Sequence, residues 1–115
     1  MLIKDGARFA LLHNDNSTPM LNLRVAFSDT PLGPWGSSRD AYTAKFYENP
    51  VAIQLGGEWW IYAAKTASRA TALQKTRDFW TYTDAGTVRF PVGLRMAAVL
   101  EVPGSIANRL PRYQP

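Results

Sequence analysis

Apolar side chains in this chain come in short runs separated by glycine or proline, a pattern that indicates β-strands rather than long helices. Gly6 and the Gly56-Gly57 pair lie between apolar runs, where tight hairpins are expected because glycine adopts positive φ without strain. Segments 24–28 and 71–75 alternate polar and apolar residues, the period of a strand with one buried face. The sequence therefore predicts an all-β fold.

The same unit occurs twice along the chain. Residues 2–12 align with residues 52–62, and both segments consist of an apolar strand, a glycine turn and a strand that begins with aromatic residues. Downstream, residues 23–35 parallel residues 72–80, and each of these segments contains a hydroxyl residue and an acid before its tryptophan. The offset of roughly 50 residues lies in the range expected for β-propeller blades of four strands each.

The repeat predicts one partial propeller domain. We expect two four-stranded antiparallel blades at residues 1–45 and 46–90, one extra innermost strand at 91–103 and a tail at 104–115. A helical turn over 105–110 is expected in the tail. Propellers typically have four to eight blades, so two blades leave flanks that need cover. The cover comes either from another chain or from blades encoded before Met1.

Segments 47–53 and 57–62 together resemble the five-bladed β-propeller glycosidases, the family 43 glycoside hydrolases and their relatives. These proteins carry a glutamate and a proline before an apolar strand, followed by a glycine turn and an aromatic strand. Segments 27–35 and 76–80 resemble their blade endings, and 90–95 resembles a segment near the C-terminus of several relatives. The likeness covers nearly the whole chain but only the C-terminal part of a family member. It implies a partial five-bladed β-propeller.

The resemblance also implies a candidate site. Glu48 matches the glutamate that acts as general acid, while the two catalytic aspartates would belong to blades that this sequence lacks. Arg95 would lie beside Glu48, although Met96 stands where relatives often have a histidine. A structural ion pair between Glu48 and Arg95 is the alternative that the missing carboxylates favour. Tyr47 and Tyr42 would form an aromatic wall for a sugar, or they pack in the core.

Other chemistry-bearing residues have structural explanations. Asp29 and Asp78 recur at equivalent positions and are expected to stabilise turns by accepting backbone hydrogen bonds. Trp35 and Trp80 are expected to pack between neighbouring blades. His13 is the only histidine and precedes a polar stretch that is expected to be a solvated loop, so a histidine-rich zinc site is excluded. No cofactor or metal is expected.

Composition narrows the partners and the compartment. The net charge is +4 with the cations scattered along the chain, so a nucleic-acid interface is not expected. The chain has no cysteine, which favours a reducing compartment. No signal peptide or membrane-spanning stretch is recognised, so a cytoplasmic protein is expected.

Two functions follow from these observations. The first is a glycosidase-like, carbohydrate-binding propeller module, which is hydrolytic only if other blades or chains complete the ring. The alternative is a non-catalytic protein that self-associates, because copies would bury the open blade flanks against one another.

Overall fold

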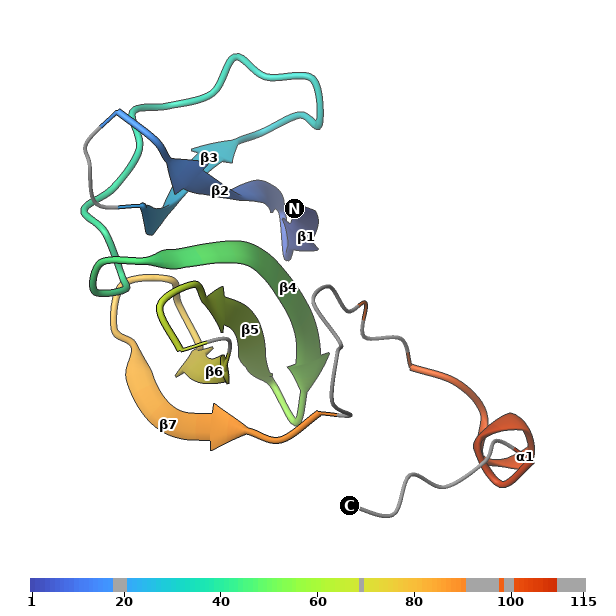
Figure 1. The fold of residues 1–115 in the computed structure, drawn as a ribbon. Helices are drawn as coiled ribbons and strands as arrows, with labels where there is room; N and C mark the ends of the chain where they lie inside the picture. The colour runs from blue at the N-terminus through green and yellow to red at the C-terminus, as the bar shows by residue number, and fades with distance from the viewer. Residues whose placement is uncertain (18–20, 69, 91–97, 99–100, 110–115) are drawn as a thin grey trace.

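A tight hairpin begins each half of the molecule (Figure 1). The structure is a computed structural model, and it describes residues 1–17, 21–68, 70–90, 98 and 101–109. The first hairpin joins β1 (Leu2–Asp5) to β2 (Arg8–Asp15), and the second joins β4 (Tyr47–Leu55) to β5 (Glu58–Lys65). The turn glycine Gly6 has φ +62°, and Gly56 and Gly57 have φ +58° and +75°. The glycine turns expected from the sequence are confirmed.

Each hairpin is extended into an antiparallel sheet. In the first sheet, β3 (Asn22–Ser28) pairs with β2 in the order β1-β2-β3. In the second, β6 (Ala70–Thr76) and β7 (Thr83–Val88) complete the order β4-β5-β6-β7. The helix α1 (Gly104–Ala107) lies apart from both sheets in Figure 1. The fold is therefore all-β with two antiparallel sheets, and the expected helical turn in the tail is present.

The prediction of four strands in the first sheet is wrong for the described residues, because an irregular segment takes the place of the fourth strand. The segment 36–43 runs along the outer edge of β3, and the Thr43 hydroxyl oxygen accepts a hydrogen bond from the Leu23 amide at 3.0 Å. Its amide donors come from every third residue whereas the carbonyl acceptors on β3 come from every second, so no strand ladder forms. The donor and acceptor pairs are Gly36 with Phe27, Arg39 with Val25 and Tyr42 with Leu23.

One apolar cluster lies between the two sheets and joins them. The buried residues of this cluster are Ile3, Ala10, Leu12 and Val25 from the first sheet, with Ala52, Trp59, Ile61 and Phe79 from the second half of the chain. The rings of Trp59 and Phe79 lie 5.8 Å apart, and the Trp59 indole N–H donates to the Asp5 carboxylate at 3.1 Å. The indole proton is thereby satisfied while the ring is buried, as aromatic burial requires.

The strand registers reproduce the sequence repeat. Asp5 pairs with Arg8 across the first hairpin, and 50 positions later Leu55 pairs with Glu58. In the same way Phe9 lies opposite Ser28, and Trp59 lies opposite Thr76. The two halves therefore have equivalent backbone pairing, and residues 50 apart in the hairpins occupy the same place in their sheets.

The expectation that Trp80 packs between the two sheets is wrong. Trp80 is 58% exposed, and the Arg39 guanidinium lies over its ring. The neighbouring Phe79 is only 1% exposed and has φ +60°, so this residue places its ring in the core and leaves Trp80 at the surface. Trp35 is partly buried.

The turn after β6 is organised by an acid, as expected. The Asp78 carboxylate accepts hydrogen bonds from the amides of Trp80 at 2.7 Å and Thr81 at 2.9 Å. These bonds hold the pKa of the Asp78 carboxyl below its ordinary value, and the bond from the Thr81 amide lowers it most. At the equivalent turn after β3, Ser28 accepts from the Thr30 amide, and the Asp29 carboxylate has no hydrogen bond to the described residues.

Replacing Asp78 by alanine is expected to lower the urea midpoint of unfolding at pH 7, because two turn amides lose their acceptor. The pKa of Asp78 is lower in the folded state, so its contribution is present above the unfolded pKa of about 4. That contribution disappears as the pH falls through the folded pKa. The gap between wild type and Asp78→Ala should therefore close in acid. Asp29→Ala is the matched control and should leave the midpoint unchanged at either pH.

Candidate functional site

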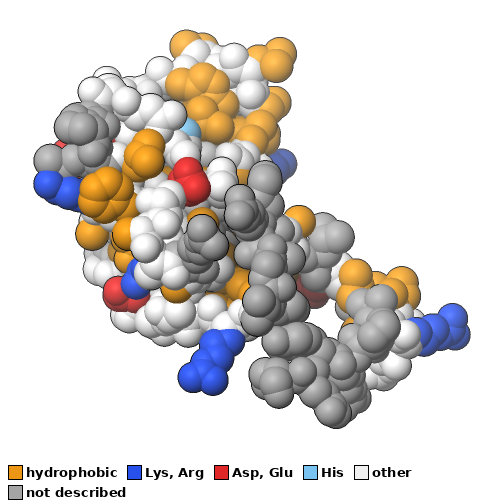
Figure 2. Space-filling model, in the orientation of Figure 1, with side chains coloured by type: hydrophobic (Ala, Val, Ile, Leu, Met, Phe, Trp, Pro, Cys, Tyr) orange, Lys and Arg blue, Asp and Glu red, His pale blue; other side chains and the backbone are white. Residues whose placement is uncertain are grey.

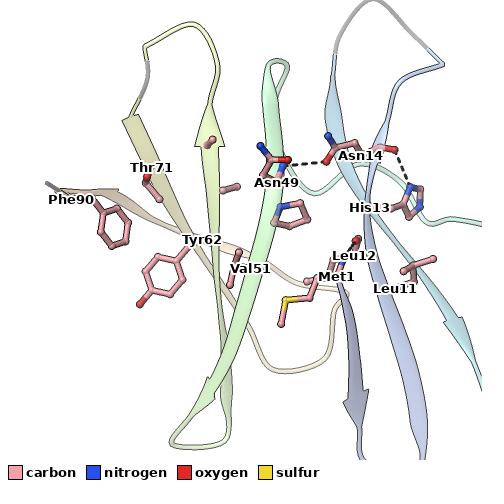
Figure 3. A pocket seen from close by; sticks show the side chains of 13 residues that line it. Met1, Leu11, Leu12, His13, Asn14, Asn49, Val51, Tyr62, Thr71 and Phe90 are labelled. Carbon is pink, nitrogen blue, oxygen red and sulfur yellow. Dashed lines mark hydrogen bonds between the residues drawn. The ribbon is translucent and has the colours of Figure 1, made fainter. Parts of the chain in front are cut away.

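A hollow of about 440 Å³ opens where the two sheets meet, near the beginning of β4 and the end of β2 (Figure 3). Strands β2, β4, β5 and β6 all contribute to it. Its apolar lining consists of Met1, Leu11, Leu12, Pro50, Val51, Ala63, Ala64 and Phe90, and its polar lining of His13, Asn14, Asn49, Tyr62 and Thr71. None of these lining residues carries a carboxylate, a lysine or an arginine side chain. The charged group among them is the Met1 amino group, which donates a hydrogen bond to the Leu12 carbonyl oxygen at 2.6 Å.

A β-bulge places one amide at the mouth of the hollow. The register of β4 against β5 shifts between Glu48 and Val51, and Asn49 within this bulge has φ +55°. Asparagine tolerates this left-handed conformation better than other residues with a side chain, and the proline that follows is tolerated at a bulge because it has no amide to donate. The Asn49 side chain is exposed as a result.

A second amide faces the bulge from β2. The Asn14 side-chain oxygen accepts a hydrogen bond from the Asn49 backbone amide at 3.3 Å, which joins the first sheet to the second (Figure 3). Asn14 was expected in a solvated loop, but β2 continues to Asp15, which pairs with Asn22. The Asp15 carboxylate accepts a hydrogen bond from the Ser17 amide and lies 2.6 Å from the Arg24 guanidinium. This pairing extends the strand far enough to bring Asn14 to the hollow.

His13 adds an imidazole held by two neighbours. Its Nδ1 lies 3.2 Å from the Asn14 backbone oxygen, and its Nε2 lies 2.8 Å from the Ser38 hydroxyl. A carbonyl oxygen only accepts, so Nδ1 carries a proton and, in the neutral ring, Nε2 accepts from Ser38. The side chain therefore connects the hollow to the segment along the edge of β3.

Aromatic rings form one wall of the hollow. The rings of Tyr62 and Phe90 meet edge to face with centroids 6.3 Å apart. With the two asparagine amides, this wall gives a site that contains neutral hydrogen-bonding groups beside apolar surface. Such a combination is typical of sites for small ligands.

The residues predicted from the family resemblance do not line the hollow. Glu48 is partly buried and pairs across the sheet with Ala64, one residue away from the lining residue Asn49. Tyr47 is 8% exposed and packs in a second buried cluster with Leu23, Ala63 and Ala72. Arg95 lies outside the described residues, as does Met96, so the structure does not describe the expected pair of Glu48 and Arg95 or most of the expected extra strand.

Tyr42 lies in the packing between the two halves. Its ring stacks on that of Tyr82, with centroids 4.5 Å apart and an angle of 10° between the planes. The Tyr42 hydroxyl is buried without a hydrogen-bond partner among the residues described, and burial raises the pKa of Tyr42. A buried hydroxyl without a partner destabilises the folded state.

The described residues contain neither a metal-binding cluster nor a membrane-spanning helix. Among them, no group of three histidine, aspartate or glutamate side chains is placed to hold a metal ion. The helix that the described part of the chain contains is too short to cross a membrane.

The asparagines and His13 were missed by sequence reasoning, although one signal pointed to the bulge. A proline inside an apolar strand marks a bulge or an edge, and Asn49-Pro50 is such a place. No sequence signal pairs Asn14 with Asn49, because these residues are 35 positions apart and meet only through the packing of the sheets.

Removing the Tyr42 hydroxyl distinguishes the two roles expected for this residue, which are contact with a sugar and packing in the core. If the ring serves only packing, Tyr42→Phe should raise the free energy of unfolding by up to about 1 kcal/mol, because it removes a buried group without a partner. Tyr42→Ala should lower it by about 3 kcal/mol through loss of the buried ring. Urea unfolding measures both. A lower stability for Tyr42→Phe would contradict this packing role.

Comparisons with protein-family models, with curated proteins and with solved structures found no match for this chain. The resemblance to the propeller glycosidases therefore depends on the residues of the sequence alone.

Proposed function

We propose that the two sheets are propeller blades and that the chain is a carbohydrate-binding module, with its ligand in the hollow between β2 and β4. The observation that carries the proposal is the set of side chains that line the hollow, in which asparagine amides lie beside aromatic and aliphatic groups and no side chain is a carboxylate, a lysine or an arginine. Sugar hydroxyls exchange hydrogen bonds with amides, and the C–H faces of a sugar ring pack on aromatic surface. A neutral sugar meets both requirements without the cost of burying a charge.

The packing between the sheets supports the blade assignment. The first sheet packs on the second with the face that carries Ile3, Ala10 and Leu12. The second sheet packs on the first with the face that carries Ala52, Trp59 and Ile61, which is the opposite face of the repeated unit. This face-to-opposite-face order is the one that a radial array of blades requires. The three-stranded first sheet would be a blade whose outermost strand is replaced by the segment 36–43.

Hydrolysis by these two blades alone is not part of the proposal. Cleavage of a glycosidic bond normally requires two carboxyl groups on opposite sides of the bond. The hollow lining has none, and Glu48 adds one at most from its position beside Asn49. Glu48 therefore remains the candidate acid only for a ring completed by other blades or chains, with Arg95, Tyr47 and Tyr42 as candidate substrate contacts.

Replacing Asn49 by glycine tests the proposed binding site. Glycine accepts the positive φ of this position, so the variant removes the amide and keeps the backbone of the bulge. Loss of one hydrogen bond worth about 1 kcal/mol should weaken sugar binding about five-fold. Calorimetric titration with neutral pentose and hexose oligosaccharides measures the change.

The matched control for this variant is Asn16→Gly, which removes an exposed amide that does not line the hollow. It should bind as the wild type does. Equal affinity of wild type and Asn49→Gly would overturn the site, and failure of the wild type to bind any neutral oligosaccharide would overturn the function. Preference for a uronic acid would contradict the neutral character proposed for the ligand.

The role of Glu48 is tested with aryl glycosides. Wild type and Glu48→Gln are expected to give the same background rate of aryl release, because a lone carboxyl group cannot both protonate the leaving oxygen and activate water. Sugar affinity should also be unchanged by the substitution. Faster release by the wild type would contradict this expectation and assign Glu48 as the acid.

A further inference from the structure

The first sheet has two different faces, and only one of them packs on the second sheet. Ile3, Ala10 and Leu12 belong to the buried face. Because side chains alternate along a strand, Leu2, Phe9 and Leu11 belong to the opposite, outer face. Leu2 is 44% exposed there, and Phe9 and Leu11 are partly exposed.

The repeat shows what such an outer face packs against. In the second sheet the residues 50 positions after Leu2, Phe9 and Leu11 are buried against the first sheet. These equivalents are Ala52, Trp59 and Ile61, which are 4%, 7% and 0% exposed. The outer face of the first sheet is therefore the equivalent of a surface that is already covered within this molecule.

The second sheet has the complementary outer face. Its residues 50 positions after the buried Ile3, Ala10 and Leu12 are Ile53, Trp60 and Tyr62, all of which are partly exposed. The Lys75 ammonium lies 3.6 Å from the centre of the Trp60 ring, so the ring has a cation on its surface rather than another apolar layer at that point. The outer face of the second sheet is therefore the equivalent of the buried face of the first sheet, which packs on the second sheet within this molecule.

We propose that a second copy of this chain docks head to tail, with the outer face of its second sheet on the outer face of the first sheet of its neighbour. The contact would repeat between molecules the packing that joins the two sheets within one molecule. Figure 2 shows hydrophobic side chains at the surface in the upper part of the molecule, where Figure 1 places the first sheet and the segment after β3. The side chains of the segment after β3 are not part of the docking face. The occupant is a second copy because this chain supplies the matching face.

Head-to-tail docking has consequences that a two-fold dimer lacks. The two partners use different faces, so an open assembly keeps one free face of each kind, one at each end, until a ring closes or the array grows. Tyr62 belongs both to the docking face and to the lining of the hollow. A docked copy would therefore cover one side of the hollow. The inference concerns assembly and is independent of whether the hollow binds sugar.

Solution mass is the first test. Light scattering on the full 115-residue chain is expected to give a mass above the 12.8 kDa of one copy, rising with protein concentration. Leu2→Glu should weaken association at least ten-fold, because it places a charge on the docking face of the first sheet. Leu32→Glu is the matched control, since Leu32 is 94% exposed and lies in the segment after β3. It should leave the mass unchanged.

A mixing experiment tests the head-to-tail geometry. Leu2→Glu blocks the face of the first sheet, and Ile53→Glu blocks that of the second, so each variant alone should be monomeric. Their mixture should form one heterodimer and nothing larger, because the intact face of each fits the intact face of the other. Circular dichroism and urea unfolding establish that each variant is folded. If Ile53→Glu is unfolded, Ile53→Lys or Trp60→Lys replaces it in the mixture.

Three outcomes would overturn the inference. A monomeric wild type at all concentrations would remove the docking surface. A mixture of folded variants that stays monomeric would exclude head-to-tail docking. Equal masses for wild type and Leu2→Glu would place the interface elsewhere. These results are read from solution mass, whereas the proposed function is read from the heat of sugar titration, so failure of this inference is distinguishable from failure of the proposed function.

Discussion

The apolar contact between the two sheets is the interaction on which the rest of the structure depends. Each sheet has too few strands to bury its own apolar face, and independent stability of a small sheet requires packing on another layer. Trp59 and Phe79 supply the aromatic rings of the buried cluster between the layers, and the Asp5 carboxylate accepts the hydrogen bond of the indole N–H that Trp59 brings there. The same contact fixes the separation of β2 and β4, and therefore the width of the hollow.

Much of the fold could be predicted from the sequence because its signals are local. The glycine turns, the alternation in the strands and the repeat all appear in short windows, and the structure agrees with each. The missing fourth strand could not be predicted in this way. Its segment contains apolar residues and reaches the edge of β3, but the three-residue spacing of its amide donors becomes visible only when the backbone is placed.

The candidate site was less predictable because it depends on long-range placement. Family resemblance drew attention to Glu48 and Tyr47, whereas the hollow is built from Asn14, Asn49 and His13. Asn14 reaches the site only because pairing of β2 with β3 continues to Asp15. Tyr42 illustrates the converse: an aromatic residue that the sequence offers as a ligand contact lies stacked between the halves of the molecule.

The irregular segment beside β3 has a consequence for how copies of this protein can aggregate. An unprotected strand border offers a row of free carbonyls and amides that recruits foreign strands and nucleates amyloid. Here the carbonyls of Leu23, Val25 and Phe27 are already occupied by donors from the same chain. The mismatch in spacing also means that this covering strip cannot itself pass on a regular ladder to a newcomer. That flank is therefore closed to templated fibril growth.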